Sequence, residues 1–174
     1  ITPPQNRWIT SVVWEGFSTY DQTGPIQYED RWGSFPGMQT SGADNYYNHG
    51  IYNAWQHYGM AMGNPLLPGP AYNADGSITF RSNRVKAQHI GLCGNPTDEW
   101  SWRVLATYAR YWGTYATPLD KVRKQAYTLA EVSYRPAWAK GWSVTLAGAM
   151  DRGNYLGNST GGSLTLRKTG SLLK

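Results

Sequence analysis

The repeating pattern of this chain is clearest at residues 100–113, which read WSWRVLATYARYWG. Apolar and aromatic residues take alternate positions there, namely Trp102, Val104, Ala106, Tyr108 and Trp112. Arg110 interrupts this parity, and the opposite parity holds Ser101, Arg103 and Thr107. Because successive side chains of a β-strand point to opposite faces, the alternation predicts a strand with one apolar and one polar face.

Five further stretches are expected to form strands. They are residues 7–20, 78–92, about 124–134, 142–151 and 163–169. The connections between the expected strands alternate between longer loops and short turns, at 21–77, 93–99, 114–121, 135–141 and 152–162. Strands of about ten residues joined in this way are typical of an outer-membrane β-barrel.

The expected fold class is therefore all-β: a segment of an antiparallel outer-membrane β-barrel, with about six strands here and a long loop that carries a short helix. Single-chain bacterial barrels begin at about eight strands, so residues 1–174 are expected to be part of a larger barrel domain. A soluble β-sandwich shows similar alternation and stays open as an alternative. Which side chains of the second and fourth strands face the lumen and which face lipid is left open. In the fourth strand the reason is that Leu129 shares a parity with Glu131.

The composition is polar without being strongly charged. Charged residues make up 16% of the chain, against roughly 25% in an average soluble domain. The aromatic residues are mainly Tyr and Trp, 13 and 9 against 3 Phe, and rings with a polar handle suit sugar-facing surfaces and water–lipid boundaries. The net charge of +5 comes from scattered basic residues without a nucleic-acid motif, so nucleic acid is not an expected partner.

Other compositional limits are few. Cys93 is the single cysteine, which rules out an internal disulfide, and it is expected in a short turn. No stretch approaches the roughly 20 apolar residues of a membrane helix, but a membrane β-strand needs only about 9–11 alternating residues. Residues 1–5 carry neither an initiator Met nor the apolar region of a signal peptide, as in a chain cut from something longer.

The connection 21–77 contains an aromatic stretch, DNYYNHGIYNAWQHYGMAMGNPLLPGP, at residues 44–70. Apolar side chains recur in it at helical spacing, at Ile51, Trp55, Tyr58 and Met62, and predict a short helix. Asp44 can cap the start of this helix, and Gly63 with Pro65 can end it. Loops of this length are usually functional or disordered, and the aromatic content argues against disorder.

This loop supplies the groups that sugar binding needs, which are flat aromatic faces together with amides and carboxylates. The candidate aromatic platforms are Trp32, Tyr46, Tyr47, Trp55 and Tyr58. The candidate partners for sugar hydroxyls are Asp44, Asn45, Asn48, Gln56 and Asn64. At helical spacing, however, Trp55 and Tyr58 fit the loop's own core better than a ligand site, and Asp44 suits a helix cap equally well.

Basic side chains form a second candidate group on the strands. Arg84 and Lys86, with Arg103, can attract an acidic glycan into the lumen of a barrel. Alternatively, they can pair with Glu15 and Glu131 across the barrel, and this is the favoured interpretation because inward charges normally pair or are solvated.

Catalytic interpretations are weaker. Glu29, Asp30 and Asp44 can supply the carboxylate pair of a glycosidase, but nothing in the sequence fixes their separation. His49 and His57 do not form a His-Glu-x-x-His motif, so no metal site is expected. In the absence of a nucleophile elbow, a P-loop or a dinucleotide fingerprint, we expect no enzymatic activity and no cofactor.

Four stretches carry a resemblance to a known family: residues 45–67, 80–91, 108–115 and 162–170. The first of them includes YGMAMGNPLL at 58–67. They resemble the C-terminal part of the capsule-assembly Wzi family, in the form found in Bacteroides-type bacteria. The resemblance implies a many-stranded barrel in the cell outer membrane with extra helices. It further implies a non-enzymatic surface lectin that helps to attach capsular polysaccharide to the cell.

The expected partners are accordingly capsular polysaccharide and outer-membrane lipid. Two alternatives stay open: an outer-membrane channel for solutes, and a soluble β-sandwich enzyme that acts on carbohydrate.

Overall fold

The computed structural model describes residues 7–21, 27–29, 38–41, 56–57, 60–62, 64–69, 71–115 and 117–170. These residues form strands, turns and irregular segments, and none of them is helical. The all-β expectation is thus confirmed for the described part of the chain. Within the same part, no helix has the length and apolar character needed to cross a membrane.

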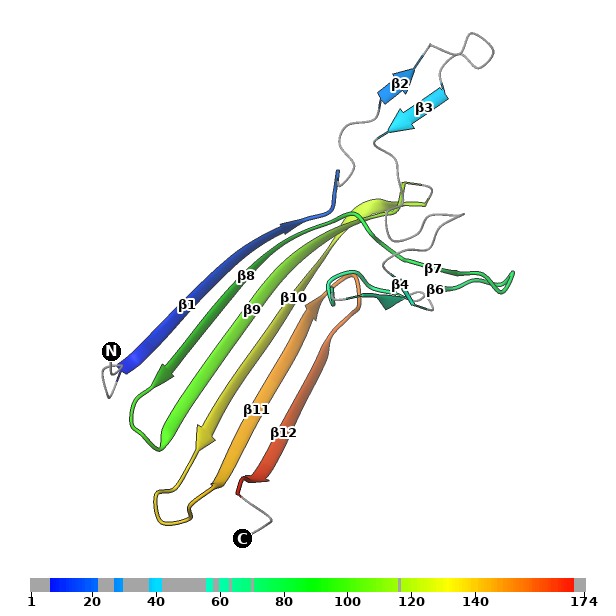
Figure 1. Ribbon diagram of the computed structural model, residues 1–174. Helices are drawn as coiled ribbons and strands as arrows, with labels where there is room; N and C mark the ends of the chain where they lie inside the picture. The colour runs from blue at the N-terminus through cyan, green and yellow to red at the C-terminus, as the bar shows by residue number, and fades with distance from the viewer. Residues whose placement is uncertain are drawn as a thin grey trace. The chain divides into compact units, whose positions relative to one another are not determined.

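Six strands form one antiparallel sheet, in the order β1–β8–β9–β10–β11–β12 (Figure 1). They are β1 (Arg7–Ser18), β8 (Val85–Asn95), β9 (Trp100–Gly113), β10 (Pro118–Tyr134), β11 (Trp142–Gly153) and β12 (Ser159–Lys168). Apart from the segment inserted between β1 and β8, strands that follow one another in the chain are neighbours in the sheet. This meander is the arrangement that short antiparallel connections favour.

The inserted segment contains three two-stranded pairs. They are β2 (Gln27–Glu29) with β3 (Met38–Ser41), β4 (Gln56–His57) with β5 (Met60–Ala61), and β6 (Ala71–Tyr72) with β7 (Ile78–Thr79). The expected helix is wrong where it is described: His57 pairs with Met60, and Gln56 with Ala61, as in a hairpin. A glycine within the pattern lowers the helix propensity. Residues 44–55 lie outside the described part.

Strand boundaries differ from the expectation by more than two residues at four places. The second expected strand is broken between β7 and β8, because the Ser82 hydroxyl accepts from Gly113 N at 3.0 Å and occupies a position that a strand neighbour would use. β8 runs on to Asn95, so Cys93 lies in a strand and not in a turn. β10 begins at Pro118, where a residue without an N–H is tolerated, and β12 begins at Ser159.

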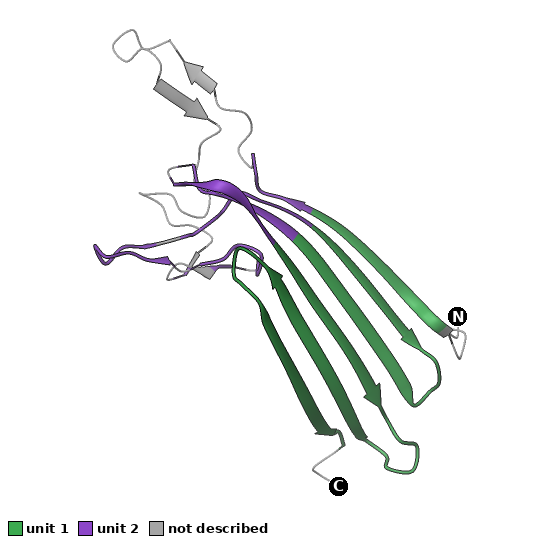
Figure 2. Cartoon of the chain, turned by 180° about the vertical axis from the view of Figure 1, so that it is seen from behind, with its two compact units in different colours: residues 1–16, 88–108, 125–174 green, residues 17–87, 109–124 purple. Residues whose placement is uncertain are grey.

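The chain separates into two compact units, drawn in Figure 2. Unit 1 comprises residues 1–16, 88–108 and 125–174, and unit 2 comprises residues 17–87 and 109–124. Strands β1, β8, β9 and β10 each contribute residues to both units. The units are described separately below.

Unit 2 contains the hydrophobic core. Among the described residues, every buried hydrophobic side chain belongs to this unit: Leu67, Phe80, Val85, Ala87, Ala109 and Tyr111. Buried polar groups hold the end of β1 to β8. Thr19 N donates to Val85 O at 2.8 Å, and the Thr19 hydroxyl accepts from Val85 N at 3.1 Å and donates to Asn83 O at 2.7 Å.

Unit 1 is a sheet with two chemically different faces. Even-numbered residues on the paired strands form an apolar face, with the rows Val132–Leu146–Leu164 and Tyr134–Val144–Leu166. Odd-numbered residues form a polar face, with the rows Glu131–Ala147–Ser163 and Ser133–Thr145–Thr165. The apolar side chains are not covered: Leu146 is 64% exposed and Leu164 is 72% exposed. The alternation predicted from the sequence therefore produces an amphipathic sheet without a packed core in this unit.

Candidate functional site

The apolar face of unit 1 continues across β9 to the edge strand β1. Trp100 on β9 stacks on Tyr134 of β10, with ring centroids 4.6 Å apart. Beside this pair lies a hollow of about 490 Å³, lined mainly by aromatic and apolar side chains and including Trp8, Trp102 and Val132. Indole and phenol rings at strand ends are the groups that proteins place at a water–lipid boundary.

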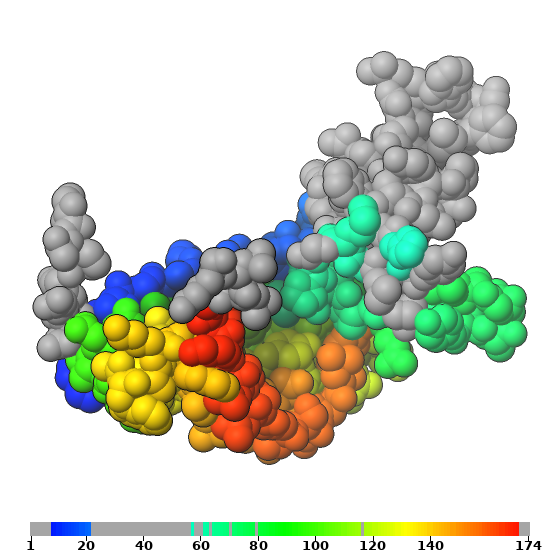
Figure 3. All heavy atoms as spheres, turned by 60° about the horizontal axis from the view of Figure 1, so that its bottom comes forward, coloured from blue at the N-terminus to red at the C-terminus, as the bar shows by residue number. Residues whose placement is uncertain are grey.

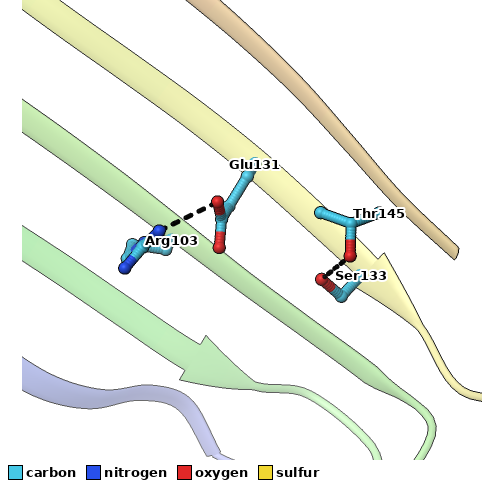
Figure 4. Close-up of polar contacts among 4 residues, drawn as sticks. All are labelled: Arg103, Glu131, Ser133 and Thr145. Atoms are coloured by element: carbon cyan, nitrogen blue, oxygen red, sulfur yellow. Dashed lines mark hydrogen bonds and ion pairs between the residues drawn. The ribbon is translucent and has the colours of Figure 1, made fainter. Parts of the chain in front are cut away.

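The polar face of unit 1 carries paired polar groups (Figure 4). Arg103 Nη2 on β9 lies 3.0 Å from Glu131 Oε2 on β10 and donates a hydrogen bond to it. The hydroxyls of Ser133 and Thr145 hydrogen-bond at 2.7 Å between β10 and β11. The ambiguous fourth strand is thereby oriented, with Glu131 on the polar face, and the predicted pairing is confirmed for Arg103 and Glu131.

A cluster of cations and aromatic rings lies in unit 2, and we call it the Arg84 cluster: Tyr20, Asp21, Arg84, Lys86, Arg110, Trp112 and Tyr115. Arg84 is its centre, because its Cζ lies 4.1 Å from the ring centroid of Tyr20 and 4.3 Å from that of Tyr115. Arg84 Nε also donates to Tyr20 O at 3.3 Å. A planar guanidinium suits this position between two rings better than an ammonium group.

Two other cations of the Arg84 cluster surround Trp112. Lys86 Nζ lies 4.6 Å from the Tyr20 ring centroid and 5.9 Å from that of Trp112, while Arg110 Cζ lies 5.5 Å from Trp112. Trp112 meets Tyr20 edge to face, with centroids 4.8 Å apart. The rings therefore hold the cations in place through cation–π contacts.

Tyr115 connects the cluster to its one acidic member. Its hydroxyl donates to Asp21 Oδ1 at 3.4 Å. Burial raises the pKa of Tyr115, the nearby Arg84 opposes this effect, and Asp21 adds to it. The phenol thus stays protonated as a donor throughout the neutral pH range.

The chemistry of the Arg84 cluster is that of an anion-attracting surface. Three cations accompany one carboxylate, Asp21, so the cluster has an excess of positive charge at neutral pH. One face of the Tyr20 ring and one face of the Tyr115 ring are covered by Arg84, which leaves less ring surface for stacking on a sugar. The arrangement therefore favours charge recognition over stacking.

The structure brings together two of the predicted ligand residues, Arg84 and Lys86, but their partners are aromatic rings and not Glu15 or Glu131. Asn64 has a local role, because its Oδ1 accepts from Leu66 N at 2.9 Å in a turn. Gln56 lies in β4, where only its backbone is described. The remaining candidates lie outside the described residues: Trp32, Asp44, Asn45, Tyr46, Tyr47, Asn48, Trp55 and Tyr58.

Sequence reasoning missed five members of the Arg84 cluster: Tyr20, Asp21, Arg110, Trp112 and Tyr115. The alternation of long and short connections was the available signal. It places the end of the first strand, the start of the second and the end of the third at the same end of a meander. Aromatic and basic residues at those three chain positions are therefore expected to meet.

Metal chemistry finds no support in the described residues, where no group of three or more His, Cys, Asp or Glu side chains is placed to hold a metal ion. Comparisons with family models, with curated proteins and with solved structures find no match to this chain.

Proposed function

We propose that this chain is a segment of an outer-membrane β-barrel that binds or retains capsular polysaccharide at the cell surface, without catalysis. The observation that carries the proposal is the division of unit 1 into an uncovered apolar face and a polar face. In the proposed barrel, lipid covers the apolar face and water fills the space along the polar face.

The size of the uncovered face supports a lipid environment. Large apolar side chains are exposed on β1, β9, β10, β11 and β12 of unit 1, among them Trp8, Trp14, Tyr108, Leu146 and Leu166. Soluble monomers rarely expose a contiguous apolar patch larger than a few hundred Å². A β-sandwich would cover such a face with a second sheet, and the described residues provide no such sheet.

The polysaccharide part of the proposal rests on the resemblance to the Wzi family and on the Arg84 cluster. An acidic polysaccharide would be attracted by the excess cations, and the aromatic contacts keep those cations in fixed positions. The partner that this chemistry favours is a glycan with carboxylate or phosphate groups.

The test uses the full-length parent protein, expressed with its own signal sequence. We expect it in the outer-membrane fraction, with a gel mobility in SDS that changes on boiling, and we expect its deletion to release capsule into the medium. Restoration with an Arg84→Gln, Lys86→Gln variant should give less cell-bound capsule than restoration with a control Lys121→Gln variant. Recovery as a soluble protein would refute the barrel, and unchanged capsule retention after deletion would refute the polysaccharide role.

A solute channel is a second candidate, favoured by the hydroxyl-rich polar face around Ser133, Thr145 and Thr165. Conductance in planar bilayers distinguishes the two functions. Stable single-channel currents would favour the channel, whereas a silent protein that retains capsule would favour the lectin.

A further inference from the structure

A second cationic site lies in unit 1, on the polar face at the turn between β10 and β11. A hollow of about 780 Å³ opens there, within the range of about 300–1,000 Å³ that is usual for small-ligand pockets. Its lining combines side chains of the turn with polar-face residues of β10, β11 and β12. Figure 3 looks onto this end of the molecule, where the turn (yellow) lies beside the end of β12 (red).

The charge of this hollow is unbalanced. Arg135 and Lys140 from the turn and Arg167 from β12 line it, and no carboxylate is among its lining residues. The carboxylate of Glu99 lies beside the hollow, because its Oε1 accepts from the backbone N of the lining residue Ala137 at 2.7 Å, so three cations face this one neighbouring carboxylate. Cations that converge on one concave surface raise the local concentration of anions.

Hydroxyl groups line the same hollow behind the cations. Ser133 and Thr145 form one hydrogen-bonded pair, and Thr165 lies directly beside Thr145 on the next strand. Hydroxyls can both donate and accept hydrogen bonds, as the hydroxyls of a sugar do. A bare anion would need donors only. Cations and hydroxyls in the same lining together match a ligand with an acidic group and several hydroxyls.

The turn that presents the cations is fixed by several hydrogen bonds. Arg135 N donates to Glu99 O at 2.8 Å, and Thr169 N donates to Gly141 O at 2.7 Å. Lys168 Nζ donates to Lys140 O at 2.6 Å. Gly141 has a φ of +78°, and a Cβ at this position would lie 2.2 Å from Thr169 O, so the close approach requires glycine. Such a turn offers its charges with little ordering cost on binding.

We propose that this hollow binds an acidic saccharide, with its carboxylate or phosphate held by Arg135, Lys140 and Arg167 and its hydroxyls by Ser133, Thr145 and Thr165. The class of ligand rests on the proposed function. The site itself is separate from the Arg84 cluster, because its lining residues all belong to unit 1.

The test measures binding to the purified protein in detergent by titration calorimetry. The probes are a hyaluronan tetrasaccharide, which carries carboxylates, neutral maltotetraose, and inorganic phosphate. We expect saturable binding of the acidic tetrasaccharide, weakened about tenfold by Arg167→Gln and by Arg135→Gln, because each variant loses a charge-assisted hydrogen bond to the ligand. Arg167→Lys should retain most of the binding, and higher salt should weaken it.

Controls separate this proposal from the proposed function. Lys121→Gln makes the same change of net charge outside the hollow and should leave the affinity unchanged. If Arg84→Gln abolishes binding while Arg167→Gln has no effect, the site proposed here is wrong and the Arg84 cluster is the binding site. Equal binding of maltotetraose, or phosphate binding as tight as that of the tetrasaccharide, would also overturn the proposal. The gel mobility shift on boiling verifies that each variant is folded.

Discussion

Arg103 donates to Glu131 across 3.0 Å, and this ion pair fixes which face of β10 is polar. The next residue, Val132, consequently lies on the opposite face in one row with Leu146. The two side chains of the pair are 50% and 25% exposed, so the pair is partly solvated and contributes modestly to stability. Its main consequence is the register of the sheet, because a slip of β10 by one residue would move Glu131 to the apolar face and separate it from Arg103.

The first prediction tests this division with two adjacent positions of β11. In the barrel proposed above, Leu146→Arg places a charge on the lipid-facing side and should lower the free energy of unfolding in phospholipid vesicles by about 2–4 kcal/mol. Ala147→Arg, on the polar face, should cost less than about 1 kcal/mol because water solvates the charge. Urea titration followed by tryptophan fluorescence measures both values. Equal costs would contradict the assignment of the faces.

The second prediction concerns a close approach between β8 and β1. A Cβ at Gly94 would lie 1.8 Å from Trp8 O and 2.7 Å from Trp102 Nε1, so the backbone of β1 would have to move. We expect Gly94→Ala to lower the free energy of unfolding by about 1–3 kcal/mol, the usual cost of overpacking. Gly148→Ala is the matched control, since nothing lies within 4 Å of its Cβ position. A Gly94→Ala protein as stable as the control would refute the close approach.

The regular strands of unit 1 were predictable because alternation is a local property that the sequence records at every second residue. The expected strand at 100–113 coincides with β9, and the expected turn at 135–141 separates β10 from β11. The exposure of the apolar face agrees with the fact that local alternation alone predicted these strands. Apolar side chains of this face such as Leu146 and Leu164 stay exposed, so packing against a second layer does not compete with the local pattern at these positions.

Two of the failures involve longer-range contacts. The break before β8 depends on hydrogen bonds between Ser82 and Gly113, which are 31 residues apart in the chain. The Arg84 cluster combines residues from three separate segments, and no periodicity within one segment reveals it. The expected helix failed for a local reason at the described residues Gln56–His57 and Met60–Ala61, which pair as antiparallel strands, because a glycine in the sequence pattern lowers the helix propensity.

The third prediction concerns the stacking of Arg84 between Tyr20 and Tyr115. Arg84→Gln removes two cation–π contacts and should lower the free energy of unfolding by about 1–2 kcal/mol. Arg84→Lys should recover only part of this loss, because an ammonium group cannot stack on both rings. Arg81→Gln, at an exposed position, should stay within about 0.5 kcal/mol of the parent protein. If Lys at position 84 restored full stability, charge alone and not stacking would explain the site.

The fourth prediction concerns the turn between β6 and β7. The Ser77 hydroxyl and the Ser77 amide both donate to Asp75 Oδ1, at 2.7 Å and 2.9 Å, and these bonds hold the pKa of Asp75 below its ordinary value. The folded turn therefore favours the charged carboxylate. Its stabilisation is complete above the ordinary pKa of about 3.9 and is lost as the pH falls through the lowered pKa.

Nuclear magnetic resonance of the Ser77 amide measures this effect. Its chemical shift should change along one titration curve with a midpoint below about 3.9, as the turn loosens under acid conditions. Asp75→Asn should remove the titration, since the amide side chain does not ionise in this range. A midpoint at or above the ordinary value would show that the hydrogen bonds do not favour the carboxylate.

The last prediction concerns Gln125, a fully buried polar side chain that holds the loop between β11 and β12. Its Nε2 donates to Gly157 O at 2.7 Å, and its Oε1 accepts from Leu156 N at 3.1 Å and from Tyr155 N at 3.4 Å. Gln125→Leu keeps the approximate volume but leaves these backbone groups without their partner. Because an unsatisfied buried polar group costs about 1–3 kcal/mol, we expect a loss of about 2–3 kcal/mol and faster proteolysis of the loop.

Gln125→Glu is the informative comparison. It retains acceptors for Leu156 N and Tyr155 N but turns a donor into a second acceptor facing Gly157 O, and it buries a charge. We therefore expect it to be destabilised at neutral pH and to recover as the carboxyl becomes protonated at lower pH, when it can again donate to Gly157 O. Gln88→Leu, at an exposed position of β8, serves as the control and should change stability by less than about 0.5 kcal/mol. If Gln125→Leu behaved like this control, the loop would be held by its own backbone and not by the buried amide.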